Sequence, residues 1–350
     1  MELVHFLFWS YTIWVLPVVS YKSDSLKGLS FESDSIAYHI FDDQQDSIKI
    51  NTVRDQHGDT FWYRHVDTEV CLTGECKRID VGIYWELSGD FKGLEVYKEP
   101  LTKTDHSDFK PWDYAKLMSI LENDWSILRE YTMEELTDNG TDEVDGKTGA
   151  TKKEISEESV ENAVYTTFTL WHLIHQGEKE QLAIHASKLL NQSALQTRII
   201  GSDDRKKQQL LLEQYALGNI ASTRKVELLI LKSLSTNSDI TLYQTALKAL
   251  AKTAITDFEF QNEIGKLYAK SSINQKVGLL SSFQPGHPLS PEFYALISKD
   301  LSAENEWLAI KILTLFKYSK TQSDYVLETL QQLKKSSNPA VLEAVNALSK

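Results

Sequence analysis

The stretch "DVGIYWELSGDFKGLEVY", residues 80–97, indicates how the N-terminal half of the chain folds. Two apolar runs rich in β-branched and aromatic residues flank the segment "SGDFKG", which holds two glycines and an aspartate. Such runs are typical of strands, and Gly beside Asp is typical of a hairpin connection. The stretch therefore predicts a pair of antiparallel strands.

Similar patterns continue on both sides of this hairpin. The upstream segments "SIAYHIF", "SIKINTV" and "TFWYRHV", residues 35–41, 47–53 and 60–66, also read as strands. Downstream, "PWDYAKLMSILEND" (residues 111–124) spaces its apolar residues as a helix does, and Pro111 suits a first helical turn. We therefore expect a β-rich domain that includes at least one helix.

The chain changes character near residue 155. The segment at residues 154–177 predicts one long helix that ends on Gly177, a typical C-cap residue. Amphipathic segments then recur nearly to the end, with a period of roughly 15 to 20 residues, so that two helices form a unit somewhat shorter than common helical repeats. "ALKALAKTA" and "VLEAVNALSK" have the composition of HEAT-like repeats. We predict a right-handed α-solenoid of irregular repeats, with an irregular helical bundle as the alternative.

Charge and the N-terminus bear on partners and location. The formal net charge is -13, without a basic stripe, so we expect no nucleic-acid partner. Residues 3–20 carry no Lys, Arg, Asp or Glu. As a helix they would be about 27 Å long, slightly short for a bilayer core of about 30 Å. Val18 and Ser20 are spaced like a cleavage site, although Glu2 stands where a basic residue is usual.

We predict a signal peptide at residues 1–20. An uncleaved anchor that associates the protein with a membrane is the main alternative, and a buried strand is a weaker one. Export would place the protein in the periplasm or on the outer face of a bacterial membrane. In such an oxidising compartment, Cys71 and Cys76 of "CLTGEC" are expected to form a disulfide across a tight turn. A zinc site is disfavoured because zinc needs about four ligands.

The loop between the β-rich and helical regions contains a distinctive motif. The sequence "DGKTGAT", residues 145–151, resembles the Asp-x-x-(Ser/Thr)-Gly-Ala-Thr signature of FMN-binding domains, which occur in sodium-pumping quinone reductases and Rnf-type complexes. Five fixed positions should match by chance in on the order of one chain in a thousand of this length. Helix capping by Thr148 or Thr151 is the structural alternative. The matching positions are Asp145, Thr148, Gly149, Ala150 and Thr151.

The resemblance implies that a flavin transferase attaches FMN to the hydroxyl of Thr151 through the phosphate. A looser resemblance covers residues 70–117 and 160–173, which are similar to a group of exported bacterial proteins that join an FMN-binding-like domain to helical repeats. That group supports the architecture more than a particular activity.

Further residues are weaker candidates for contacts with FMN. Tyr84 or Trp85 could stack on the flavin ring, but neighbours on a strand face opposite ways, so only one of them can, and a hairpin core is the alternative. Lys103 could contact the phosphate or the flavin's negative locus, and His106 could transfer a proton, unless both lie in a surface turn. Residues 165–167, downstream of the motif, could line the site.

His172 and His175 share one helical face, which is a weak indication of a metal site.

Together these patterns predict an α+β protein with three parts. Residues 1–20 form the signal peptide or anchor, residues 21–177 an FMN-binding-like domain, and residues 178–350 an all-α HEAT-like domain. We expect an exported electron carrier that is the substrate of a flavin transferase and docks a redox protein or membrane electron-transfer complex. An extracytoplasmic scaffold with a vestigial motif is the main alternative, and a flavin-dependent reductase is a third.

Overall fold

The computed structural model describes residues 18–41, 45–70, 76–136, 153–175, 177–236, 239–253, 255, 257–284, 286, 288–302, 304–317 and 324–348. The chain divides into two compact units, Met1–His185 and Ala186–Lys350, called unit 1 and unit 2 below. The division falls inside helix α4 (Glu178–Leu190), whereas we expected the helical domain to begin at residue 178.

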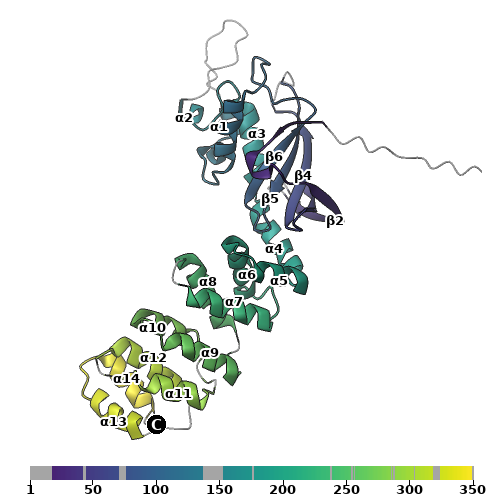
Figure 1. Cartoon of the computed structure of the whole chain (residues 1–350). Coiled ribbons are helices and arrows are strands. Elements are labelled where there is room, and N and C mark those ends of the chain that lie inside the picture. Colours follow the sequence, from purple (N-terminus) through teal and green to yellow (C-terminus); the bar gives the residue numbers. More distant parts are fainter. Residues whose placement is uncertain are drawn as a thin grey trace, which may run out of the picture. The chain divides into compact units, whose positions relative to one another are not determined.

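Among the described residues of unit 1, six strands form one curled antiparallel sheet in the order β1-β6-β5-β4-β3-β2 (Figure 1). The predicted hairpin is confirmed, because β5 and β6 pair with Ile83 opposite Leu94. The strand bounds are Val19–Lys22 for β1, Phe31–Phe41 for β2, Ser47–Asp55 for β3, Thr60–Thr68 for β4, Ile79–Trp85 for β5 and Phe91–Tyr97 for β6.

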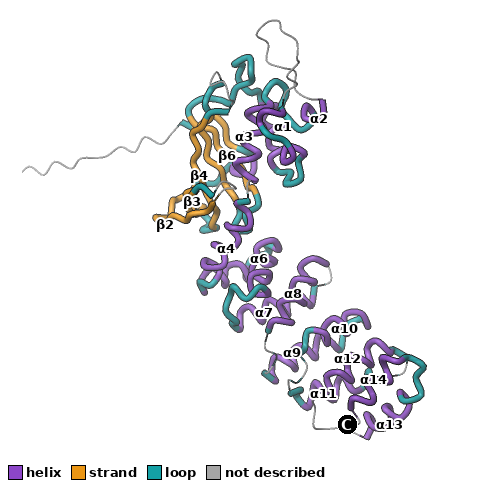
Figure 2. The backbone as a smooth tube through the Cα atoms, turned by 180° about the vertical axis from the view of Figure 1, so that it is seen from behind, coloured by secondary structure: helices purple, strands orange, loops and turns teal. Residues whose placement is uncertain are grey.

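The two faces of this sheet are covered differently. One face packs against α3 (Val164–His175), where the buried Trp85 indole donates a hydrogen bond of 3.3 Å to the Ile174 carbonyl. The opposite face carries an apolar cluster built on Leu26 of η1 (Asp24–Leu26), the short 3-10 turn that follows β1. Helix α1 (Pro111–Leu121) contacts α3 and lies beside the β1 end of the sheet (Figure 2).

Two local features differ from the sequence-based expectations. Strand β1 was not predicted, since its first residues belong to the apolar segment assigned to the signal or anchor. The single helix expected over residues 154–177 is wrong: α2 (Lys153–Ser156) and α3 are separate. Between them Asn162 adopts a positive φ of 56°, and the Val160 N–H donates to the Thr167 hydroxyl, so the segment turns instead of continuing as helix.

Unit 2 is helical, which confirms the coarse prediction of a β-rich region followed by a helical one. Its helices form two rows, because α5, α7, α9 and α11 contact in succession, as do α6, α8, α10, α12 and α14. Several helices begin at Asp, Ser or Thr caps, such as Thr223, whose hydroxyl accepts from the Val226 N–H. No helix of the described residues has the length and apolar character needed to span a bilayer.

The helices of unit 2 are bounded as follows: α5 Ser193–Gly201, α6 Arg205–Ala216, α7 Arg224–Ser235, α8 Ile240–Lys252, α9 Phe258–Tyr268, α10 Ile273–Ser281, α11 Pro291–Ser298, α12 Glu306–Phe316, α13 Asp324–Leu333 and α14 Pro339–Leu348.

Candidate functional site

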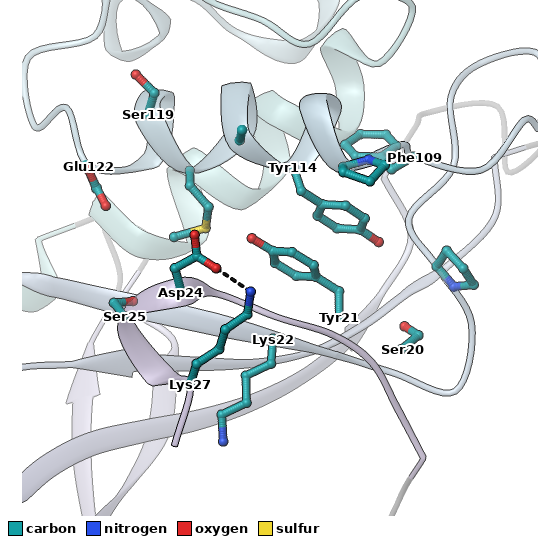
Figure 3. A pocket seen from close by; sticks show the side chains of 14 residues that line it. Ser20, Tyr21, Lys22, Asp24, Ser25, Lys27, Phe109, Tyr114, Ser119 and Glu122 are labelled. Atoms are coloured by element: carbon teal, nitrogen blue, oxygen red, sulfur yellow. Dashed lines mark ion pairs between the residues drawn. The ribbon is translucent and has the colours of Figure 1, made fainter. Parts of the chain in front are cut away.

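A cleft of about 870 Å³ lies in unit 1 between the β1–η1 segment and α1 (Figure 3). This volume falls within the range of small-molecule sites, which is roughly 300 to 1,000 Å³. The β1–η1 side contributes mainly polar residues, and Pro100 and Phe109 add apolar surface. Helix α1 contributes Pro111, Tyr114, Ala115, Met118, Ser119 and Glu122.

The helical period explains why α1 presents this wall. Positions three and four residues apart share one face of a helix, so residues 111, 114, 115, 118, 119 and 122 form one stripe. The adjoining face of the helix, which includes Leu117 and Leu121, is fully buried in the core. Ala115 and Ser119 are exposed and small, so the cleft stays open between the helix and the strand.

Stacked aromatic rings form one wall of the cleft. The rings of Tyr21 and Tyr114 are nearly parallel, at 9°, with centroids 3.8 Å apart, and Figure 3 shows them side by side. Phe109 meets Tyr114 edge-on at 5.4 Å. The Tyr114 hydroxyl accepts a hydrogen bond from the Leu101 N–H at 3.0 Å, and burial raises its pKa to about 12. Tyr114 is therefore a neutral, fixed ring at neutral pH.

The rim of the cleft is polar. Asp24 and Lys27 form an exposed ion pair of 2.5 Å, which Figure 3 marks with a dashed line. Lys22, on the neighbouring strand, pairs with Glu95 at 2.9 Å. Burial, and secondarily the negative charge of Asp24, raises the pKa of Tyr21, so this residue also presents a neutral phenol.

A buried polar network supports β1 from the opposite face of the sheet. The Glu95 carboxylate accepts hydrogen bonds from the hydroxyls of Tyr84 and Tyr97, each at 2.9 Å. Burial raises the pKa of both tyrosines, which keeps them protonated as donors. Gly82 makes room for this arrangement, since a Cβ there would lie 2.3 Å from the Tyr97 hydroxyl oxygen. The network anchors Lys22, and hence β1, to the sheet.

The predicted flavin contacts lie outside this cleft. Trp85 is fully buried against α3, and Tyr84 is engaged with Glu95. The Lys103 ammonium forms an ion pair of 2.9 Å with the buried Asp113 of α1. His106 is exposed in a turn, where its backbone has a positive φ of 62°.

Other predictions fall where the structure describes nothing or describes ordinary packing. The whole signature, residues 145–151, and Cys71 lie outside the described residues, so the disulfide to Cys76 and the attachment at Thr151 stay predictions. Residues 166 and 167 are buried within α3.

The two histidines of α3 bind backbone carbonyls. His172 donates to the Phe168 carbonyl at 3.0 Å, and His175 donates to the Leu121 carbonyl at 2.9 Å. Burial lowers the pKa of His175. Within the described ranges, no group of three or more His, Cys, Asp or Glu residues could hold a metal ion.

Sequence reasoning missed the cleft itself. The stripe on α1 was visible as helical spacing, but nothing in the sequence indicated that β1 would place Tyr21 against Tyr114. Comparisons of the chain with protein-family models, curated proteins and solved structures give no match.

Proposed function

We propose that this chain is an exported electron carrier that holds FMN covalently, as a phosphoester on the hydroxyl of Thr151. The observation that carries the proposal is the signature at residues 145–151, which ends two positions before Lys153, the first residue of α2. In this proposal residues 21–177 form an FMN-binding-like domain, and the helices of unit 2 form a HEAT-like array that docks the redox partner.

The residues of unit 1 fit a flavin. The cleft has the volume of a small-molecule site, one aromatic wall and a polar rim, which suits a planar ring system with one apolar and one polar end. When bound, the flavin would supply the electron-transfer chemistry, while the protein fixes its position and its access to water.

Attachment would require a separate transferase with an activated FMN donor. The Thr151 oxygen would form a new bond to phosphorus as a phosphoanhydride bond of the donor breaks. The leaving phosphate takes the electron pair of the broken bond, and the hydroxyl proton passes to a base of the transferase. An unactivated threonine hydroxyl is a weak nucleophile at neutral pH, so a base must activate it. The transferase would supply that base, and the chain itself needs none for this step.

The test is the intact mass of the full chain after co-expression with an exported flavin transferase. We expect a gain of one FMN phosphoester, lost in Thr151→Ala and kept in Thr148→Ser, because the signature accepts Ser or Thr at the latter position. An unmodified chain, with the transferase active on a control substrate, would contradict the proposal and favour the scaffold function.

The helical unit supports docking of a partner. Unit 1 carries 17 Lys and Arg against 35 Asp and Glu, whereas unit 2 carries 20 against 15, so the helical unit is net positive. A second cleft, of about 510 Å³, lies between α10 and the start of α12, where the Trp307 side chain is 77% exposed. Exposed Trp is enriched at interfaces. The net positive charge of unit 2 as a whole favours an acidic partner protein, whereas the charged residues that line this cleft are Glu304 and Glu306.

A further inference from the structure

We propose that the cleft between α10 and the start of α12 docks a segment of a partner protein in which an arginine lies next to apolar residues. The proposal rests on the docking role proposed for unit 2 and not on FMN at Thr151. The net charge of unit 2 says nothing about where a partner binds or which of its side chains makes the contact. The cleft residues Trp307, Ile273, Glu304 and Glu306 indicate both.

Neighbouring helices of one row begin together at this cleft. It joins the first turn of α10 to the first residues of α12, and these two helices lie side by side in both views (Figures 1 and 2). The start of α14 is adjacent as well, because the Ser336 hydroxyl and the Asn338 amide each donate a hydrogen bond of 2.8 Å to the Glu306 carboxylate. These two bonds fix the Glu306 carboxylate in place beside the cleft.

Apolar side chains that the core does not use line the cleft. The buried face of α12 includes Leu308, Ala309 and Ile312, whereas the Trp307 side chain is 77% exposed. Across the cleft, Ile273, the first residue of α10, is 48% exposed. Exposed apolar groups that lie together favour a contact that removes them from water.

The polar wall of the cleft is acidic. Glu304 and Glu306 line it, and the described lining residues include no Lys or Arg. Hydrogen bonds from Asn338 and Ser336 lower the pKa of Glu306, so its carboxylate stays ionised at neutral pH. Within the described part of unit 2, neither carboxylate forms an ion pair. A cleft with apolar surface and two such carboxylates is complementary to an apolar segment that carries a cation.

Unit 1 contains a similar arrangement in which the arginine is present. Trp125 is 79% exposed, nearly as much as Trp307, and the Arg129 guanidinium lies over its ring, 5.1 Å from the centroid. Arg129 also pairs with the Glu130 carboxylate at 3.0 Å. Trp307 lies beside carboxylates too, but no cation among the described residues lies over its ring. An arginine of the partner would complete the same set of contacts.

Arginine fits this site better than lysine. Its planar guanidinium stacks on aromatic faces and can form two hydrogen bonds to one carboxylate, whereas the lysine ammonium is a compact, strongly hydrated charge. Unit 2 as a whole is net positive, but charges more than about 8 Å away are largely screened at physiological ionic strength. The two carboxylates therefore dominate the electrostatics of a short segment bound in the cleft.

The experiment follows the indole N–H signal of Trp307 by NMR in the isotope-labelled full chain, prepared without a flavin transferase. The probe is the capped peptide Gly-Leu-Arg-Leu-Gly, and loss of the signal in Trp307→Phe assigns it. We expect a saturable shift of this signal. A peptide with citrulline in place of arginine has nearly the same shape without the charge and should bind roughly tenfold more weakly. The Trp125 signal should stay in place, because Arg129 already covers that ring.

Glu304→Gln tests the acidic wall, since this exposed side chain can lose its charge without altering the core. It should weaken binding of the arginine peptide about twofold to fivefold, as expected for the loss of an exposed ion pair. The matched control is Glu292→Gln, which makes the same change at an exposed residue in the first turn of α11, in the other row, and should leave binding unchanged. Equal effects of the two variants would contradict a contact at the cleft.

Three further results would overturn the assignment. The first is a Trp307 signal that stays in place at millimolar peptide. The second is equal binding of the citrulline peptide, or tighter binding of a peptide with glutamate in place of arginine, which would favour an acidic partner. The third is a Trp307 signal that moves with protein concentration alone, which would assign the cleft to a second copy of the chain. None of these results depends on FMN, so this proposal and the proposed attachment fail separately.

Discussion

The two edge strands of the sheet in unit 1 have different neighbours: side chains of α4 hydrogen-bond to β2, whereas β1 borders a cleft. At the β2 edge, the Gln181 amide oxygen accepts from the Phe41 N–H at 2.8 Å, and its amide nitrogen donates to the Phe41 carbonyl at 2.5 Å. His185 donates to the His39 carbonyl at 3.1 Å. At the β1 edge, a strand of four residues borders an open cleft instead.

The difference shows how one sheet can protect one edge strand from pairing and leave space for a ligand at the other. An unpaired strand edge invites pairing with another chain, and proteins cover such edges or keep them short. The long strand β2 is covered, because a side-chain amide of α4 replaces the groups that a seventh strand would offer. The short strand β1 leaves room for the cleft.

The largest effect on this arrangement is expected from Gly89→Ala. Gly89 has a φ of 86° in the β5–β6 turn, and a Cβ there would lie 2.7 Å from the Cα of Lys179 in α4. Left-handed strain of about 1 to 2 kcal/mol adds to a clash with backbone of about 1 to 3 kcal/mol. We expect the free energy of unfolding of unit 1 to fall by about 2 to 5 kcal/mol, as measured by urea unfolding.

Gly28→Ala is the matched control on the β1 side. Gly28 also has a positive φ, of 76°, but no atom lies within 4 Å of a Cβ built there. Its cost should therefore be the backbone strain alone, about 1 to 2 kcal/mol. Tryptophan fluorescence suits this measurement, because Trp307 is the one described tryptophan outside unit 1. Equal costs for the two variants would show that α4 does not press on the β5–β6 turn.

An intermediate effect is expected from Gln181→Leu. It removes both side-chain hydrogen bonds to Phe41, and a typical net hydrogen bond contributes about 1 kcal/mol. Loss of both bonds, about 2 kcal/mol together, should then make local opening of the β2 edge roughly thirtyfold more frequent, as measured by amide hydrogen exchange at Phe41. Gln181→Glu keeps an acceptor for the Phe41 N–H, so its exchange should be slower than in the leucine variant. Similar exchange in both variants would contradict the proposed role of the amide.

These edges also show what could be inferred from the sequence. Alternation and turn residues predicted the β5–β6 hairpin and the strands before it, since both signals are local. The β1 strand was hidden, because Val19 and Ser20 continue an apolar N-terminal run. The break before α3 was missed because the Asn162 carbonyl accepts hydrogen bonds from the Thr104 N–H and hydroxyl, a contact across the sequence that helical spacing does not indicate.

The candidate site was predictable only in part. The signature at residues 145–151 is a contiguous pattern and can be read directly. The pairing of Tyr21 with Tyr114 joins residues far apart in the sequence, and no spacing rule connects them. The same holds for Lys103, which was expected near a phosphate and instead pairs with Asp113, because a buried carboxylate needs a partner.

The smallest effect concerns the pH dependence of the α1–α3 contact, which holds the cleft wall in place. Burial lowers the pKa of His175 in the folded protein, while the unfolded chain titrates near 6.5. As the pH falls below about 6.5, the unfolded chain protonates this histidine before the folded protein does. The folded state is therefore fully favoured above about pH 6.5 and loses stability relative to the unfolded chain toward lower pH. We expect urea midpoints to fall from pH 7.5 to pH 5.5, and to fall less in His175→Gln.

Glutamine suits this test because its amide can still donate to the Leu121 carbonyl, as His175 does in the native protein. The matched control is His106→Gln, which alters an exposed turn and should leave the pH dependence as in the wild type. If His175→Gln kept the full acid sensitivity between pH 7.5 and pH 5.5, the loss of stability would have to come from groups other than His175. Burial opposes ionisation of Asp80, but its hydrogen bonds to Lys98 and His65 outweigh this and lower its pKa, so its contribution is lost only in more acidic solution. The pH at which stability falls thus distinguishes the contribution of His175, at the α1–α3 contact, from that of Asp80, whose ion pairs lie on the other face of the sheet.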